Sequence, residues 1–384
     1  MNYFFTDEQK MIIETAREIA IKKILPVREH YDREGIFPWD IVKACAEADL
    51  CGLYIPQEYG GFGGGVFELC LAVEEMSKVD GGISLAIAAT ALGTFPILLF
   101  GSEEQKKKYL PDIAAGKKLA AFALTEANAG SDALGMKTTA VLKDDYYILN
   151  GTKQWITNGE NAEIYTVMAV TNPSKGARGI SAFIVEKGTP GFSFGKHEDK
   201  MGIRASSTTE LIFTDCKIPK SNILGKEGMG AIIAITTLNY SRPGVGAQAL
   251  GIAAGALEDA IKYSRQRVQF GASISSFQAI QHMLADMATQ VEAARALLYA
   301  TARTIDAGEK KFAKESAMTK LFCSDVAMKV TIDAVQIFGG YGYMREYPME
   351  KRMRDAKITQ IYEGTNQIQR NEIALALIKD AASL

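Results

Sequence analysis

The chain has 384 residues, 47% of them hydrophobic and 23% charged, a composition typical of a globular protein rather than a disordered or fibrous one. This length exceeds the size at which one hydrophobic core usually stays undivided, so two or three domains are expected. The net charge of -2 excludes the long-range positive field that attracts nucleic acid or acidic lipid.

Cysteine and histidine usage argues against a metal site and a disulfide framework. The five cysteines form no CxxC pair, and the three histidines are scattered, with no second ligand at metal-binding spacing. The apolar surroundings of the cysteines indicate reduced, buried thiols and a reducing compartment. No signal or transit segment is recognisable at the N-terminus, so the cytoplasm is the expected location.

The first third of the chain has the periodicity of helices. Thr6 and Gln9 stand at capping-box spacing, and the helix that follows them should end near Pro26. The stretch 83–100 is the most apolar, but threonine, glycine and proline interrupt it, so no membrane insertion is expected. Residues 1–120 are therefore predicted to form an all-helical domain. Its further helices are expected over residues 38–48, 66–79, 83–100 and 103–115.

Strand chemistry replaces this pattern after about residue 121. Short runs rich in β-branched and aromatic residues alternate with turns. Their regular spacing favours a small sandwich or barrel over residues 121–227. The expected strands are 138–142, 146–149, 165–170, 180–185 and 210–213.

The helical period returns after about residue 228 in four long segments, 243–267, 276–307, 313–338 and 365–382. Four long amphipathic helices favour a bundle, and their alanine-rich faces permit close helix packing. The predicted architecture is therefore multi-domain and mainly helical, with a central β-domain and a C-terminal four-helix bundle over residues 228–384.

Two glycine clusters, at residues 60–65 and 339–342, invite a phosphate-loop interpretation. The first has no GK[ST] after it, and the second follows a helical segment rather than a strand. A dinucleotide, if one binds, is therefore held in another way.

The turn LTEANAGSD and the following strand are each open to two interpretations. Thr125 and Ser131 belong either to a plain turn or to a set of hydroxyl and backbone groups that contact the edge of a polar ring. Trp155 is either a core residue or an indole that covers one face of a planar heterocycle, with Thr157 at its edge.

Arg267 and Glu363 are ambiguous in the same way. Arg267 and Phe270 offer a fixed charge and an aromatic surface suited to a pyrophosphate and adenine, or Arg267 simply ends a helix. Glu363 lies among apolar residues and before Gly364, where burial raises the pKa of a carboxyl towards that of a general base. A lone glutamate beside a turn also serves structural roles, so both remain open.

Together these motifs resemble the acyl-CoA dehydrogenase family over essentially the whole chain. They occur in the family's order and at its spacing. The motifs are LTEANAGSD from Leu124, QWITNG from Gln154, DKMGIRAS from Asp199, RQRVQFG from Arg265, FQAIQ from Phe277, AVQIFGGYGY from Ala334 and RDAKITQIYEGTNQIQR from Arg354.

The resemblance implies one FAD per subunit, a homotetramer and the conversion of an acyl-CoA to its trans-2-enoyl-CoA. Glu363 would remove the proton next to the thioester, while the next carbon delivers a hydride to the flavin. Electrons would then pass to an electron-transfer flavoprotein. By the same resemblance, an acyl-CoA contacts Ser131, Asn239, Arg242, Tyr362 and Gly364.

The resemblance also implies three groups of FAD contacts. Around the ring they are Phe122, Leu124, Thr125, Ser131, Trp155, Ile156 and Thr157. From the last helix they are Thr365 and Gln367. For the adenosine and pyrophosphate, partly across a subunit interface, they are Arg267, Gln269, Phe270, Phe277, Gln278, Gln336, Gly339 and Gly340.

Three departures from the family pattern bear on the substrate. Ala127 replaces a common proline, and Asn239 stands where a carboxylate often occurs, beside the bulky Tyr240. Residues 83–88 lack the positive charge of glutaryl-specific members, which favours a monocarboxylic acyl group of short to medium length. A branched or cyclic acyl group, enoyl-CoA reduction, an oxidase or hydroxylase, and a non-catalytic helical scaffold are the alternatives.

Overall fold

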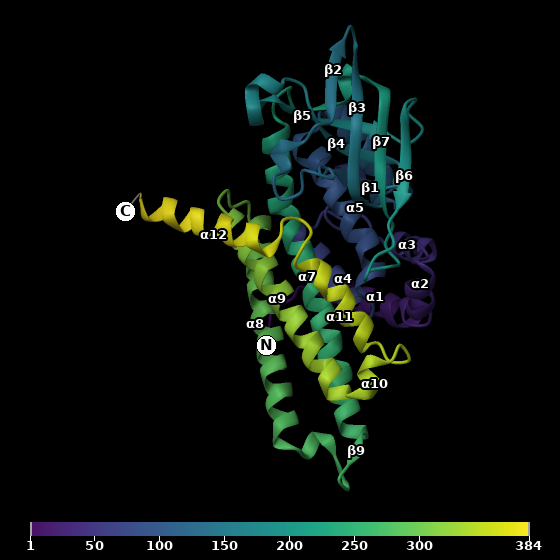
Figure 1. Ribbon diagram of the computed structural model, residues 1–384, viewed down its shortest axis with the longest axis vertical. Coiled ribbons are helices and arrows are strands. Elements are labelled where there is room, and N and C mark those ends of the chain that lie inside the picture. The colour runs from purple at the N-terminus through teal and green to yellow at the C-terminus, as the bar shows by residue number, and fades with distance from the viewer. Residues whose placement is uncertain (1, 383–384) are drawn as a thin grey trace.

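The computed structural model describes residues 2–382. Figure 1 shows a β-sheet at one end, long C-terminal helices that run to the other end, and N-terminal helices packed beside both. Thr6 and Gln9 form the predicted capping box at the start of the first helix. The N-terminal helices are α1 (Asp7–Ile19), α2 (Arg28–Glu34), α3 (Trp39–Glu47), α4 (Val66–Ser77), α5 (Gly81–Phe100) and α6 (Glu103–Ala114).

Helix α5 is apolar on all sides and lies in the centre of the molecule (Figure 1). By length and composition alone this helix could cross a membrane. However, 72% of its most apolar stretch is buried inside the fold, as in a core helix. The residues that the sequence suggested as interruptions lie within this helix: the Thr90 and Thr94 hydroxyls donate to carbonyls one turn earlier, and Pro96 is internal.

Close packing brings α5 directly against the first strand, β1 (Ala120–Ala123). A Cβ at Gly93 would lie 2.5 Å from the Ala121 backbone nitrogen, so only glycine permits this approach. The contact places the face of α5 that carries Leu85, Ala89 and Leu92 beside the end of β1.

The central sheet has the order β6-β7-β3-β2-β4-β5-β8, with β1 paired to β4. The part formed by β6, β7, β3 and β2 joins the part formed by β4, β1, β5 and β8 where Thr139 of β2 pairs with Val170 of β4. Strand β3 joins the predicted run 146–149 to the strand predicted around Trp155, and β7 extends beyond both ends of the run 210–213. Register shifts near Gly151 and Lys153 interrupt their pairing without ending it. The remaining strands are β2 (Thr139–Lys143), β3 (Tyr146–Thr157), β4 (Ile164–Val170), β5 (Ile180–Glu186), β6 (Phe192–His197), β7 (Thr208–Pro219) and β8 (Ile223–Leu224).

Helix α7 (Gly230–Gln266) begins 13 residues before the predicted start at Pro243. Proline lacks an N–H, so the carbonyl of Asn239, four residues earlier, loses its helical donor. The Ser316 hydroxyl of α9 (Ala313–Phe338) donates to this carbonyl at 2.6 Å, which allows the helix to continue. The sequence therefore misplaced this helix start, because the compensating group comes from a distant segment.

The C-terminal bundle contains α7, α8 (Gln278–Asp306), α9 and α11 (Met349–Thr359), with the short α10 (Gly340–Tyr343) before α11. Helix α12 (Asn366–Ala381), the predicted fourth member, contacts α9 but then extends away from the body (Figure 1). A hairpin of β9 (Val268–Gln269) and β10 (Ala272–Ser273) joins α7 to α8 at the far end of the bundle. We propose residues 1–120, 121–227 and 228–384 as the domain limits.

Candidate active site

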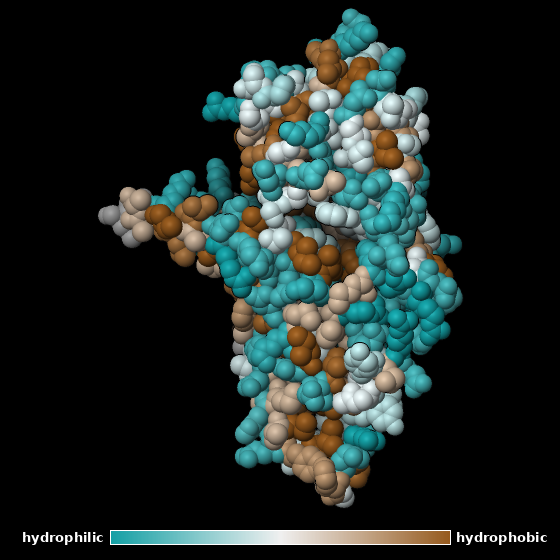
Figure 2. Space-filling model, viewed as in Figure 1, coloured by the Kyte–Doolittle hydropathy of each residue, from teal (hydrophilic) through white to brown (hydrophobic). Residues whose placement is uncertain are grey.

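A cavity of about 390 Å³ lies where the β-domain, α5, the first half of α7 and the segment before α12 meet. Figure 2 shows a hollow with apolar atoms in its depth between the sheet and the helices below it. Most residues expected around the flavin ring and the acyl group line this cavity. They are Phe122, Leu124, Thr125, Ser131, Trp155, Ile156, Thr157, Arg242, Tyr362, Glu363 and Gly364.

Glu363 enters the cavity from a turn with unusual backbone geometry. Its φ is +52°, in the left-handed region that non-glycine residues rarely adopt, and Gly364 follows with φ +90°. The Gln369 side-chain amide donates to the carbonyls of Glu363 and Gly364 at 3.1 and 3.0 Å. Lys320 Nζ donates to the Gly364 carbonyl at 2.8 Å. These bonds hold the strained turn in place.

The Glu363 carboxyl has an environment suited to a base. Burial raises its pKa above the ordinary value, while a hydrogen bond from Ser241 and the charges of Arg242 and Lys320 offset part of that rise. Lys320 is itself fully buried, and burial lowers its pKa to about 7. A carboxyl with a raised pKa accepts a proton from carbon more readily than an ordinary glutamate does.

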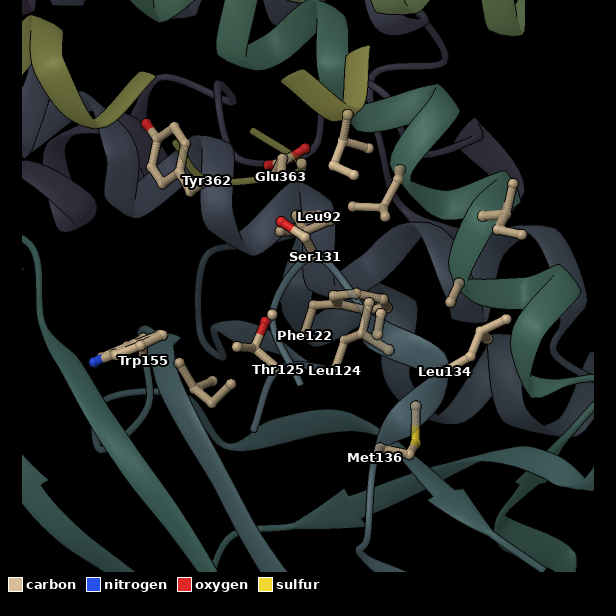
Figure 3. Close-up of a pocket in the computed structure, with 18 of the residues that line it drawn as sticks. Leu92, Phe122, Leu124, Thr125, Ser131, Leu134, Met136, Trp155, Tyr362 and Glu363 are labelled. Carbon is tan, nitrogen blue, oxygen red and sulfur yellow. The ribbon is translucent and has the colours of Figure 1, made fainter. Parts of the chain in front are cut away.

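The opposite wall of the cavity comes from the β-domain (Figure 3). Thr125 and Trp155 face Glu363 across the cavity, and 55% of the Trp155 surface is exposed. The Gln154 N–H donates to the Thr125 carbonyl at 2.9 Å, which ties the turn to β3. A hydrophobic wall that also offers hydroxyl groups suits a planar heterocycle.

A buried ion pair fixes the turn that carries Thr125. Lys153 Nζ lies 2.8 Å from Glu126 Oε1 and donates to the Leu124 carbonyl at 3.0 Å. The Glu126 carboxylate also accepts the backbone N–H groups of Lys137 and Thr138. The side chain of Lys153 is fully buried, so these partners replace its hydration.

Arg242 is a second charged group on the Glu363 side of the cavity. It is only 4% exposed, and one of its guanidinium nitrogens donates to Asn239 Oδ1 at 3.0 Å. Within residues 2–382 its Nε has no hydrogen-bond partner. Asn239 itself does not line the cavity and reaches it only through Arg242. A buried cationic donor with unused capacity is suited to a polar ligand atom.

The expected adenosine contacts lie elsewhere, at the hairpin end of the bundle (Figure 1). The Arg267 guanidinium lies 5.3 Å from the ring centre of Tyr341, next to Gly340, and the rings of Phe270 and Phe277 are 6.2 Å apart. Phe270 is 98% exposed. The fold therefore gathers these residues with one another, but away from the cavity.

Thr365 and Gln367 line a separate hollow of about 350 Å³ at the start of α12. The Thr365 hydroxyl accepts the Ile368 N–H at 3.3 Å and so caps α12. Its position beside Gly364 places this hollow directly next to the cavity wall.

Sequence reasoning found Arg242 but missed the apolar residues that α7 contributes. Ala231, Ala234, Ile235 and Leu238 line the cavity together with Arg242. Their spacing is that of one face of a helix, and it could have predicted this contribution. Pro243 instead suggested a later start for the helix.

Three family models match successive parts of the chain. Residues 6–117 match the N-terminal domain of acyl-CoA dehydrogenase, residues 121–216 the middle domain and residues 228–378 the C-terminal domain. The chain belongs to the acyl-CoA dehydrogenase family. It is therefore a flavoprotein oxidoreductase that acts on CH–CH bonds and depends on FAD.

Other members of the acyl-CoA dehydrogenase family are similar over nearly the full length. The chain is 50% identical over 381 residues to the acryloyl-CoA reductase (NADH) of Anaerotignum propionicum, covering 99% of this chain and 96% of that one. Butyryl-CoA dehydrogenase from Megasphaera elsdenii is 50% identical, with a TM-score of 0.96 and coverage of 98% and 100%.

A third similar structure concerns electron transfer. It is a chain from "Electron transferring flavoprotein of Acidaminococcus fermentans: Towards a mechanism of flavin-based electron bifurcation", 55% identical, with a TM-score of 0.96 and coverage of 98% and 99%.

The cavity fits the ring of FAD in size and chemistry. Its volume of about 390 Å³ is in the range of cofactor pockets, roughly 300 to 1,000 Å³. The hydroxyls of Thr125 and Thr157 make no hydrogen bond among the described residues, so both remain available to a ligand. We therefore propose that this acyl-CoA dehydrogenase family member holds the flavin ring against Trp155.

Proposed function

We propose that the protein converts a short, saturated acyl-CoA to the trans-2-enoyl-CoA, with Glu363 as the base. The observation that carries this proposal is the position of the Glu363 carboxyl across the cavity from Thr125 and Trp155 (Figure 3). An acyl group between these two walls has a proton acceptor on one side and the proposed flavin site on the other.

FAD, when bound, supplies the acceptor for the hydride that leaves the third acyl carbon. Glu363 accepts the proton from the second carbon, which lies next to the thioester. The Glu363 N–H has no hydrogen-bond partner within residues 2–382, so we propose that it donates to the thioester carbonyl. This donation acidifies the carbon from which the carboxylate takes the proton.

The space beyond Glu363 supports a short acyl chain. A cavity of only about 10 Å³ continues past the carboxyl, with walls that include Leu85, Phe95 and Gln248. Gln248 is itself fixed, because its amide donates to the Gly81 carbonyl at 2.7 Å and its oxygen accepts the Tyr362 hydroxyl. A volume of this size holds about one water molecule. A long chain would have to displace these buried groups.

Anaerobic titration with saturated acyl-CoAs should therefore show a sharp length preference. Butyryl-CoA should bleach the flavin absorbance roughly 5- to 150-fold faster than octanoyl-CoA, because overpacking a filled site costs about 1 to 3 kcal/mol. Equal rates for both lengths would show that the small cavity does not limit the acyl chain. Failure of every acyl-CoA to bleach the protein with FAD bound would contradict dehydrogenation.

Enoyl-CoA reduction is the second candidate, and the similarity to an acryloyl-CoA reductase supports it. The same groups would serve, with protonated Glu363 returning a proton to the second carbon. Crotonyl-CoA should then reoxidise the dithionite-reduced protein faster than butyryl-CoA reduces the oxidised protein. We propose an electron-transfer flavoprotein as the redox partner, on the strength of the similar Acidaminococcus fermentans structure.

We also propose that a second copy of the chain completes the FAD site, within a homotetramer. The residues expected to hold adenosine lie at the hairpin end of the bundle, far from the cavity of the same chain (Figure 1). Apolar side chains on the protruding α12 also remain uncovered in the single chain (Figure 2), namely Leu375, Leu377 and Ile378, which are 66%, 50% and 66% exposed.

Arg267→Ala should weaken FAD binding by about tenfold or more, since a hydrogen bond to a charged group contributes about 1.5 to 3 kcal/mol. The measurement is the dissociation constant of FAD, from flavin fluorescence on adding the cofactor to apoprotein. Arg265→Ala is the matched control, because Arg265 is exposed two residues earlier. Unchanged FAD affinity for Arg267→Ala would remove this arginine from the cofactor site.

A further inference from the structure

A serine of α7 makes direct contact with the proposed base. The Ser241 hydroxyl donates to Oε2 of Glu363 at 2.5 Å, and Ser241 is only 6% exposed. The other carboxylate oxygen, Oε1, has no hydrogen-bond partner within residues 2–382. The two oxygens of the carboxylate therefore have different surroundings.

Both ends of this contact are attached to rigid supports. Ser241 lies in the turn of α7 where the Ser316 hydroxyl replaces the helical donor that Pro243 lacks. On the other side, the backbone of Glu363 is held by Gln369 and Lys320. Because the backbone is fixed at both supports, the remaining freedom is the rotation of the glutamate side chain, and the Ser241 hydroxyl restrains that rotation.

We propose that Ser241 is a positioning residue that holds Oε2 of Glu363 and leaves Oε1 free to face the substrate carbon. This inference rests on the proposed role of Glu363 as the base. A hydrogen bond to a charged carboxylate is short and strong, so the serine also favours the ionised form. The serine thus fixes the direction of the carboxylate and contributes to its ionisation.

The other groups near Glu363 do not duplicate this contact. Arg242 on α7 and Lys320 on α9 act on the carboxyl through their charge. The Tyr362 hydroxyl donates to Gln248 instead, and Glu372 of α12 interacts with Arg242. Helix α5 adds only apolar side chains to the small cavity beside the carboxyl, namely Leu85, Ala88, Ala91 and Phe95. Among these groups, the Ser241 hydroxyl is the one that donates a hydrogen bond to the carboxylate.

The proposal is tested with Ser241→Ala, Ser241→Thr and the control Ser264→Ala. Ser264 is also buried in α7, and its hydroxyl donates to the Ile261 carbonyl at 2.9 Å. Ser264→Ala therefore removes a buried serine hydroxyl from the same helix without touching Glu363. The first readout is the pH dependence of flavin reduction by butyryl-CoA in single turnover. The second is the titration of the Glu363 carboxyl by infrared difference spectroscopy, with Glu363→Gln as the reference.

Ser241→Ala should raise the midpoint of the Glu363 titration by about one pH unit. It should lower the limiting rate of flavin reduction about three- to tenfold, because the lost orientation of the carboxylate outweighs its higher basicity. The dissociation constant of butyryl-CoA should change less than about twofold. Ser241→Thr, which keeps a hydroxyl, should restore most of the wild-type midpoint, and Ser264→Ala should match the wild type.

An unchanged infrared midpoint in Ser241→Ala, or an equal shift in Ser264→Ala, would overturn the positioning role. The infrared titration needs no turnover, so it decides on Ser241 even where acyl-CoA fails to reduce the flavin. Failure of the reduction in the wild type would count against the proposed function instead.

Discussion

Glu363→Gln should bind FAD and butyryl-CoA as the wild type does, but should reduce its flavin at least about 100-fold more slowly, the usual scale for a positioned base. The amide keeps the size of the side chain, and its oxygen can still accept the Ser241 hydroxyl that lies 2.5 Å from Oε2 in the wild type. It cannot take a proton from carbon. Anaerobic stopped-flow absorbance of the flavin measures the effect.

Glu372→Gln is the matched control for this experiment, because Glu372 is the other glutamate that lines the cavity. It belongs to α12 and interacts with Arg242 rather than facing the acyl site directly. Its rate of flavin reduction should remain within about threefold of the wild type. A wild-type rate in Glu363→Gln would show that another group removes the proton.

Lys153→Met should lower the free energy of unfolding by about 3 to 5 kcal/mol, because it leaves the Glu126 carboxylate buried without its cation. The lysine is fully buried, 2.8 Å from Glu126 Oε1. Because the same pair holds the turn that carries Thr125, FAD should also bind more weakly. Urea denaturation gives the stability, and flavin fluorescence gives the FAD affinity.

The control for Lys153→Met is Lys217→Met, an exposed lysine on the neighbouring strand β7. The double variant Lys153→Met with Glu126→Gln should recover part of the lost stability, since it no longer buries an unpaired charge. Equal stability of Lys153→Met and the wild type would show that the buried pair contributes little to the fold.

Local sequence patterns predicted those features whose causes are local. The capping box at Thr6 and the helix of residues 313–338 follow from spacing alone, and the structure confirms both. The three-part architecture also follows from the change between helical and strand periodicity. In contrast, the seven-residue α2, with the sequence REHYDRE, is too short and too polar to show an apolar face.

Local sequence patterns could not predict the features that depend on residues distant in the chain. Pro243 looks like a helix start, and only the Ser316 hydroxyl, 73 positions later in the chain, explains why α7 passes through it. The face of α7 with Ala231, Ala234 and Leu238 was missed for the same reason. The contact between Ser241 and Glu363 also joins two remote segments, and no local spacing predicts it.

The site residues differ in how they could be found. Trp155 and Glu363 carry unusual chemistry in their own sequence context, so each was a candidate before any resemblance was considered. Arg242 and Lys320 acquire their character only from burial, since each is an ordinary cation in the sequence and is 4% and 0% exposed in the fold. Burial of a polar residue is a property of the whole fold rather than of its neighbours in the chain.

In the left-handed turn at Glu363 and Gly364, the backbone conformation disfavours the residue type that the proposed chemistry requires. Glutamate at φ +52° occupies the left-handed region of the backbone, which glycine or asparagine adopts at a lower conformational free energy. A library of position 363 variants selected for thermal resistance alone should therefore enrich small, turn-favouring residues. Selection for turnover should return glutamate. This residue would be kept by what it does, in spite of the conformation it must adopt to do it.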